Sequence, residues 1–243
     1  MITTQHDRQP ADFADVRATN LAVVMAHVRT AAPCSRAEIA AATGLNKATV
    51  SSLVSELIGR RLLRETGLAA NRIGRPATMI VLDGSPYAAI GLAVTPDHLS
   101  LTALDLAGER LLTWHRAGVT GTPGRTLGSA ASLVKKALTR LHADGRQILG
   151  LTAGVSGLVD AAGVVRVAAE LGWQDVPVRE SLLRALGDPG FPVTVENDAN
   201  LAAVAEHRYG AYAGARNLAL LSGGSGVAAG LIAGEPVRGG QRF

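Results

Sequence analysis

Residues Ser35–Leu63 read SRAEIAAATGLNKATVSSLVSELIGRRLL and contain two short helical patterns on either side of a turn at Gly44. Ser35 followed three residues later by Glu38 is the signature of a capping box, in which each side chain satisfies a backbone N–H of the other residue. Gly44 is suited to the sharp turn, and Asn46 is suited to cap the second helix. The stretch therefore predicts two helices joined by a tight turn.

The second helical pattern has a buried face and a polar face. Its apolar residues recur at spacings of three and four: Val50, Leu53, Val54 and Leu57. Its first turns present short side chains on the other face: Asn46, Lys47, Ala48, Thr49, Ser51 and Ser52. Such side chains let a helix backbone approach the base edges and phosphates of the DNA major groove. We assign these residues to DNA contacts, together with Ser35 and Arg36; the alternative is an ordinary helical hairpin with a polar surface.

A winged helix-turn-helix domain is predicted over residues 13–82, after a flexible arm at 1–12. An amphipathic helix is expected over Phe13–Arg29, and two strand-like runs, Leu62–Glu65 and Thr78–Leu82, follow the helix pair. Arg72 and Arg75 flank a glycine turn between the two runs and are assigned to phosphate or minor-groove contacts. The alternative is that they belong to a solvated loop.

Charge and composition limit the classes of function. Residues 1–82 carry ten Lys/Arg and six Asp/Glu, whereas residues 83–243 carry fourteen of each, so the net charge of +4 lies in the segment with the helix pair. A localised basic excess is typical of nucleic-acid binding. The single cysteine, Cys34, excludes a disulfide framework and a thiolate zinc site within this chain. No signal peptide and no membrane-spanning run is recognisable, so we expect a cytoplasmic protein without a membrane partner.

Strands and helices alternate beyond the boundary at Asp83–Pro86. Strands are expected over 88–94, 99–106, 110–116, 148–155, 193–196, 217–221 and 227–232, and helices over 126–143 and 200–209. A strand meander, then a helix, then parallel strands is an α/β layout of the actin-like, ribonuclease H-like type.

Four ordered segments carry a resemblance to a known family. They are the winged helix with Gly74-Arg75-Pro76; GVSGLVDAAGVV, Gly154–Val165; Leu171-Gly172-Trp173 and Asp175 with VENDANLAAVAEHRYGA, Val195–Ala211; and LLSGGSGVAAGLIAGEPVRGG, Leu220–Gly240. Together they resemble the ROK (repressor, open reading frame, kinase) family, in its branch of transcription regulators. The resemblance covers roughly residues 15–240 and implies an actin-like sugar-kinase-like domain over 83–243.

The resemblance also implies a sugar site. In ROK sugar kinases the aspartate matching Asp198 is the general base, and the asparagine matching Asn197 binds the sugar; Gly154 belongs to the same site. The alternative is that Asn197 and Asp198 only cap the following helix. The turn Gly223–Gly226 resembles a phosphate loop of the family, with a plain turn between strands as its alternative.

The chain departs from the kinase pattern where the family has Asp-x-Gly-Gly-Thr for the ATP phosphates. Ala93, Thr95, Pro96 and Asp97 stand in that segment. Proline has no N–H to donate, and an aspartate repels phosphate. We therefore expect no enzymatic activity, no catalytic residues and no cofactor.

A second departure is that the sequence ends at Phe243, before the family's Gly-Glu-x-Gly-His and cysteine-rich zinc motifs. We expect a C-terminally truncated ROK domain, no metal and exposed apolar surface. The function expected is that of a DNA-binding repressor of carbohydrate-utilisation genes, a homo-oligomer that binds a double-stranded operator and senses a sugar or sugar phosphate. The alternatives are a ROK-type sugar kinase with a DNA-binding arm, and a regulator that binds DNA without responding to sugar.

Overall fold

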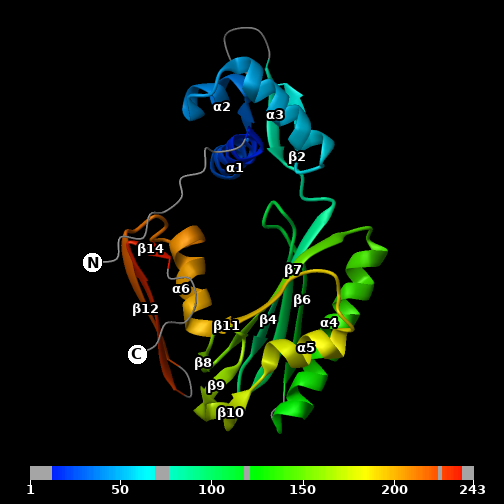
Figure 1. Ribbon diagram of the computed structural model, residues 1–243, viewed down its shortest axis with the longest axis vertical. Coiled ribbons are helices and arrows are strands. Elements are labelled where there is room, and N and C mark those ends of the chain that lie inside the picture. The colour runs from blue at the N-terminus through cyan, green and yellow to red at the C-terminus, as the bar shows by residue number, and fades with distance from the viewer. Residues whose placement is uncertain (1–12, 69–76, 118–120, 224–225, 237–243) are drawn as a thin grey trace, which may run out of the picture. The chain divides into compact units, whose positions relative to one another are not determined.

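The computed structural model describes residues 13–68, 77–117, 121–223 and 226–236 (Figure 1). The chain divides between Ser85 and Pro86 into two compact units. The first unit holds three helices and a small sheet, and the second is an α/β unit. No helix among the described residues is long and apolar enough to cross a membrane.

The first unit is built on three helices, α1 (Phe13–Ala31), α2 (Arg36–Thr43) and α3 (Lys47–Gly59). The capping box is confirmed, since Ser35 and Glu38 each accept from the other's backbone N–H. The residues predicted to face inward on α3 are all buried: Val50, Leu53, Val54 and Leu57. On α1, Val24 and Val28 are fully buried, but Val16 is 46% exposed because it borders the open groove between α1 and α3.

A three-stranded antiparallel sheet completes this unit, with the order β1-β3-β2. The predicted pair of strands is confirmed as β2 (Leu63–Leu68) and β3 (Thr78–Leu82). The short β1 (Cys34–Ser35) was not predicted; it pairs Ser35 with Met79 immediately before α2 begins. Helices followed by this ribbon confirm the winged helix-turn-helix arrangement.

The second unit centres on a five-stranded mixed sheet with the order β11-β7-β4-β5-β6. Its strands are β4 (Tyr87–Val94), β5 (His98–Leu104), β6 (Arg110–Ala117), β7 (Gln147–Val155) and β11 (Val193–Asn197). The three-strand meander and the parallel pairs β4–β7 and β7–β11 confirm the predicted layout.

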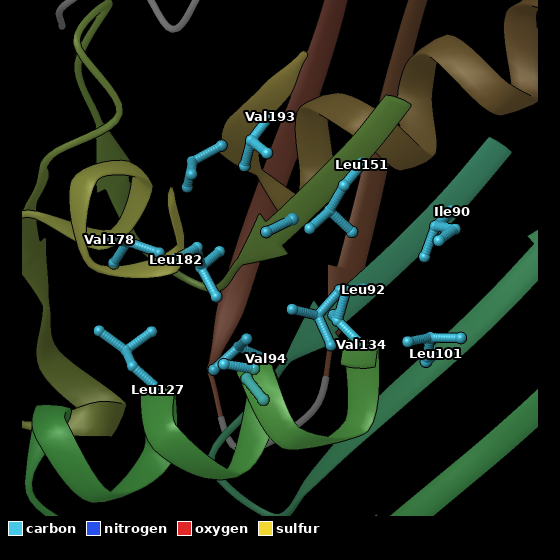
Figure 2. Packing of buried hydrophobic residues seen from close by; sticks show 14 of the residues in the cluster. Ile90, Leu92, Val94, Leu101, Leu127, Val134, Leu151, Val178, Leu182 and Val193 are labelled. Carbon is cyan, nitrogen blue, oxygen red and sulfur yellow. The ribbon is translucent and has the colours of Figure 1, made fainter. Parts of the chain in front are cut away.

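Two helices, α4 (Pro123–Ala143) and α5 (Val178–Leu186), pack against this sheet. Figure 2 shows aliphatic side chains from these helices and from the strands in one cluster, with Leu127 and Val134 from α4, Leu182 from α5, and Val134 close to Leu92 of β4. The alternation of buried and exposed residues along β4 and β5 places one face of the sheet in this core.

Two smaller sheets and the helix α6 complete the second unit. The strands β8 (Leu158–Val159), β9 (Val165–Ala168) and β10 (Trp173–Val176) form an antiparallel sheet, and the turn η1 (Ala169–Leu171) joins β9 to β10. Beyond β11, helix α6 (Asp198–Tyr209) packs against the sheet of β12 (Asn217–Gly223), β13 (Val227–Ala233) and β14 (Glu235–Pro236). The opposite face of β12 and β13 exposes Leu221, Val227 and Leu231, so an apolar surface of the predicted kind is present on this unit.

Candidate functional site

The start of α3 presents a continuous polar face in the first unit. Lys47, Ala48, Ser51 and Ser52 are exposed, and Thr49 is half-buried. The apolar residues of the same helix are packed against α1 and α2. The first two turns of α3 therefore expose short side chains and one cation, Lys47, which is the type of surface by which a helix can enter a DNA groove.

Three other residues assigned to DNA contacts have structural partners. Asn46 is exposed, and its Oδ1 accepts from the backbone N–H of Thr49 at 2.8 Å, which caps α3. Ser35 is buried, and its hydroxyl donates to Glu38 Oε2. Arg36 forms an ion pair with Glu65 on β2 at 2.8 Å. Arg72 and Arg75 lie outside the described residues.

An ion pair joins helices α1 and α3 in addition to their apolar contacts. The Arg17 guanidinium on α1 donates through Nε and Nη2 to Glu56 Oε2, and Arg60 pairs with the other oxygen of the same carboxylate. The hydrogen bond from Arg17 is the main cause that lowers the pKa of Glu56, although desolvation opposes it. Arg17, Asn20, Thr49 and Ser52 border one groove, so α1 forms a wall beside the polar face of α3.

A cleft of about 400 Å³ lies within the second unit, between the β4–β5 turn, the start of α6 and the strands β12 and β13. Its described lining combines three carboxylates and other polar side chains with glycine and apolar residues: Thr95, Pro96, Asp97, His98, Ser156, Gly157, Glu170, Asn197, Asp198, Ser222, Gly223, Gly226, Val227 and Ala228. The predicted pair Asn197 and Asp198 thus lies in a cleft of a size typical of small-ligand sites.

Asn197 and Asp198 are joined to the segment that follows β7. Asn197 Nδ2 donates to the carbonyl oxygen of Gly157 at 2.9 Å, while its Oδ1 accepts from the backbone N–H of Asn200 at 3.0 Å and caps α6. The Ser156 hydroxyl donates to Asp198 Oδ2. The capping role of Asn197 is therefore present, and the Asp198 carboxylate is held at the edge of the cleft by a hydroxyl group.

Gly154 and Glu196 lie next to the cleft but do not line it. Gly154 is buried under α6, where a Cβ would stand 3.1 Å from Leu201 Cδ1 and 3.7 Å from Asp198 Cα. Its lack of a side chain lets α6 begin close to β7. Glu196 pairs with Gly154 across the two strands, and desolvation raises the pKa of its carboxyl.

The β4–β5 turn is closed by its own hydrogen bonds. The backbone N–H of Thr95 donates to the His98 carbonyl oxygen at 3.1 Å, and the Thr95 hydroxyl makes a 3.0 Å contact with the same oxygen. The His98 backbone N–H donates in turn to Thr95 Oγ1 at 3.2 Å. The backbone N–H groups of Thr95 and His98 therefore both donate within the turn, and Pro96 has no N–H group to donate.

Sequence reasoning did not identify Ser156, His98 or Glu170 as lining residues. Ser156 lies in the segment Gly154–Val165, one of the four that carry the family resemblance, and this position in the sequence could have identified it as a lining residue. Glu170 lies in η1 and reaches the cleft only through the folding of β9 and β10, which no local pattern shows. Among the described residues, no group of three or more His, Cys, Asp or Glu side chains is arranged to hold a metal ion.

Comparison with known families accounts for both units. Residues 89–242 match the model described as the ROK family, which is more than half of the chain. The chain belongs to the ROK family. Residues 18–67 match the IclR helix-turn-helix domain, and both the predicted family and the predicted fold class are confirmed.

Individual relatives agree with this membership. The chain is 31% identical over 212 residues to the "Putative xylose repressor" of Caldicellulosiruptor sp. (strain Rt8B.4), covering 86% of this chain and 52% of the relative. A crystal structure of a ROK family transcriptional regulator, a homologue of the E. coli MLC protein, has the same fold, with a TM-score of 0.70 at 20% identity over 90% of this chain and 55% of that chain.

A ROK family glucokinase from Streptomyces griseus, solved with glucose and AMPPNP, is similar to part of this chain. Its TM-score is 0.54 at 27% identity, over 63% of this chain and 47% of that chain. The present chain thus spans about half the length of the curated relatives and solved structures that it matches. Relatives named as repressors align across both units, whereas the glucokinase aligns over less of the chain.

Proposed function

We propose that this ROK family chain is a DNA-binding repressor of carbohydrate-utilisation genes whose operator affinity responds to a sugar. The observation that carries the proposal is the exposed polar face at the start of α3, in a helix-turn-helix that precedes a ROK domain on one chain. A relative named as a putative xylose repressor aligns over 86% of the chain, which supports the proposal.

The DNA contacts proposed for the α3 helix come from its first two turns. Thr49, Ser51 and Ser52 would face base edges in the major groove, with Ala48 allowing the backbone to approach. Lys47 and Asn46 would reach phosphate oxygens next to the positive end of the helix dipole. Arg36, Arg72 and Arg75 would extend the phosphate and minor-groove contacts on the wing side, and Ser35 would support α2 through its cap.

The sugar site proposed is the cleft at the start of α6. Asn197, Asp198 and Ser156 offer amide, carboxylate and hydroxyl groups that suit sugar hydroxyls. Gly154 supports this set by letting α6 begin close to β7. A sugar bound between α6 and the β4–β5 turn would favour one arrangement of these two elements over others. In a homo-oligomer, this change would alter the distance between two α3 helices on a palindromic operator. The protein would act in the cytoplasm, where its operator is.

Kinase activity is not part of the proposal. The turn that would cradle the ATP phosphates contains Pro96 and Asp97, and the backbone N–H groups of Thr95 and His98 are used within the turn. Ala93 stands where the kinases have an acid. A coupled assay with ATP and a panel of sugars is expected to show no sugar-dependent turnover, and measurable turnover would overturn this part.

An electrophoretic mobility shift assay with the DNA upstream of the native gene tests the proposal. We expect a retarded band at low salt that an unrelated duplex of equal length does not give, and we expect a sugar from a pentose and hexose panel to change its intensity. No protein-dependent shift at low salt would refute DNA binding. A shift that no sugar changes would leave a DNA-binding regulator without a sugar response.

A further inference from the structure

An open groove of about 410 Å³ lies between α1 and α3 in the first unit. Its polar lining comes from both helices, with Arg17 and Asn20 on α1 and Thr49 and Ser52 on α3. Each of these side chains carries a hydrogen-bond donor, and none of the lining residues that the structure describes is acidic. The groove therefore offers donors and one cation to a ligand rich in acceptor oxygens.

Asn20 has no structural partner that explains its place in the groove. It lies half-buried in the second turn of α1, and its carboxamide makes no hydrogen bond to another described residue. The hydroxyl of its neighbour Thr19, by contrast, donates to the Asp15 carbonyl oxygen at 2.8 Å. Asparagine stabilises a helix interior less than alanine does, so Asn20 brings a cost to α1 that no described contact offsets. Its amide is left available to a partner outside the chain.

Arg17 places a partly neutralised cation beside Asn20. Its Nε and Nη2 donate to Glu56 Oε2, while its Nη1 donates to no described acceptor. Arg60 pairs with the same carboxylate, so Glu56 is shared between two guanidinium groups. The Arg17 side chain is 45% exposed. An anion in the groove would therefore meet a positive charge and a free N–H donor of the same guanidinium.

The groove adjoins the surface proposed to read DNA. Thr49 and Ser52 belong both to that surface and to the wall of the groove. A helix with its side chains is about 10–12 Å across, and the major groove is about 12 Å wide, so a helix in the major groove has a phosphate backbone along each flank. Helix α1 packs beside α3 on the flank of Thr49 and Ser52. Its first turns would therefore lie over one of these two backbones.

We propose that the groove between α1 and α3 receives a phosphodiester of the operator backbone, with Asn20 as a hydrogen-bond donor to it and Arg17 as the adjacent cation. The proposal rests on the DNA-binding part of the proposed function and extends the interface to a helix outside the helix pair and the wing. Because the contact involves no base, Asn20 positions the protein on the duplex and does not select the sequence.

Fluorescence anisotropy tests this with the 243-residue chain, a duplex from the DNA upstream of the native gene and an unrelated duplex of equal length. Asn20→Lys adds a cation at the groove, and Asn20→Asp adds a negative charge in nearly the same shape. Neither variant loses a described hydrogen bond, so both should melt close to the wild-type temperature. Ala22→Lys adds the same cation at an exposed position of α1 that does not line the groove, and is the matched control.

At low salt we expect Asn20→Asp to weaken binding to both duplexes about tenfold. Asn20→Lys should strengthen both about fivefold and steepen the slope of log affinity against log salt by about one, whereas Ala22→Lys should change affinity by less than about twofold.

If the wild-type chain binds the upstream duplex and the Asn20 variants bind it equally well, the backbone contact is overturned and the proposed function stands. An effect confined to the upstream duplex would assign Asn20 to a base and also overturn the phosphate contact. If the wild-type chain does not prefer the upstream duplex but the Asn20 variants shift binding to both, the backbone contact is supported and operator recognition fails. Absence of binding to either duplex would refute both proposals.

Discussion

Asn197 donates from its side-chain Nδ2 to the carbonyl oxygen of Gly157 across 2.9 Å, and so ties the first residue before α6 to the segment that follows β7. The Oδ1 of the same side chain accepts a hydrogen bond from the backbone N–H of Asn200 and so caps α6. One side chain therefore holds the helix start and one wall of the cleft in a fixed relation. The capping role of Asn197 is compatible with the proposed sugar site, because the cap determines where Asp198 stands.

Replacement of Asn197 separates its two hydrogen bonds. Asn197→Ala removes both and is expected to lower the free energy of unfolding of the second unit by about 1–2 kcal/mol. Asn197→Ser keeps a capping acceptor for Asn200 and loses only the donor to Gly157, so we expect a smaller loss. Urea denaturation followed by circular dichroism measures both; an alanine variant as stable as wild type would contradict the assignment.

Gly157 is expected to tolerate no side chain. A Cβ there would stand 2.6 Å from the Val167 carbonyl oxygen and 2.7 Å from Ala168 Cβ, so strand β9 would have to move. We expect Gly157→Ala to destabilise the second unit by about 1–3 kcal/mol. The matched control is Gly128→Ala within α4, where a Cβ meets nothing within 4 Å and helix propensity predicts a gain of about 0.5–1 kcal/mol. Thermal denaturation of the two variants should give shifts of opposite sign.

The prediction from sequence was most complete where the determinants are local. The capping box at Ser35, the cap at Asn46 and the buried face of α3 depend on residues within four positions of one another, so spacing alone identified them. The sheet of β8, β9 and β10 was missed because its strands are two to four residues long and show no period. Glu170 approaches Gly226 only through tertiary packing, so its place in the cleft had no local signal.

Asn46 allows the stability of α3 to be distinguished from DNA affinity. Aspartate is as good a helix cap as asparagine, and its charge suits the helix N-terminus. Asn46→Asp should therefore keep the melting temperature of the first unit while weakening operator binding about tenfold through repulsion of phosphate. Asn46→Ala should lose about 1 kcal/mol of stability. Fluorescence anisotropy with an operator duplex, beside thermal melts, tests both; an aspartate variant with unchanged affinity would place Asn46 away from the DNA.

Lys47 is expected to contact phosphate. Lys47→Ala should weaken binding to every duplex sequence to a similar degree and reduce the slope of log affinity against log salt by about one. Lys135→Ala, an exposed lysine on α4, is the matched control and should leave the slope unchanged. An unchanged slope for Lys47→Ala would remove this residue from the interface.

The link between Arg17 and Glu56 predicts an acid-sensitive first unit. The Arg17 hydrogen bond lowers the pKa of Glu56 below its usual value near 4.5. A carboxyl whose pKa is lower in the folded state contributes stability above its unfolded pKa, and this is lost as pH falls through the folded pKa. We expect the melting temperature of the first unit to fall with acidification in this range, and Glu56→Gln to reduce that dependence. Parallel titration curves for the two proteins would show that the pair contributes nothing.

Ser35 belongs to two structures at once. Its backbone pairs with Met79 in the ladder that leads to the wing, and its side chain forms the cap that begins α2. Loss of the β1–β3 pairing would therefore also release the helix that precedes the α3 helix. Since a residue shared in this way prevents the two parts from opening separately, the base of the ribbon and the helix pair should behave as one cooperative folding unit. The surface proposed to contact DNA would then be preorganised, so binding would not carry the entropic cost of ordering the helix pair.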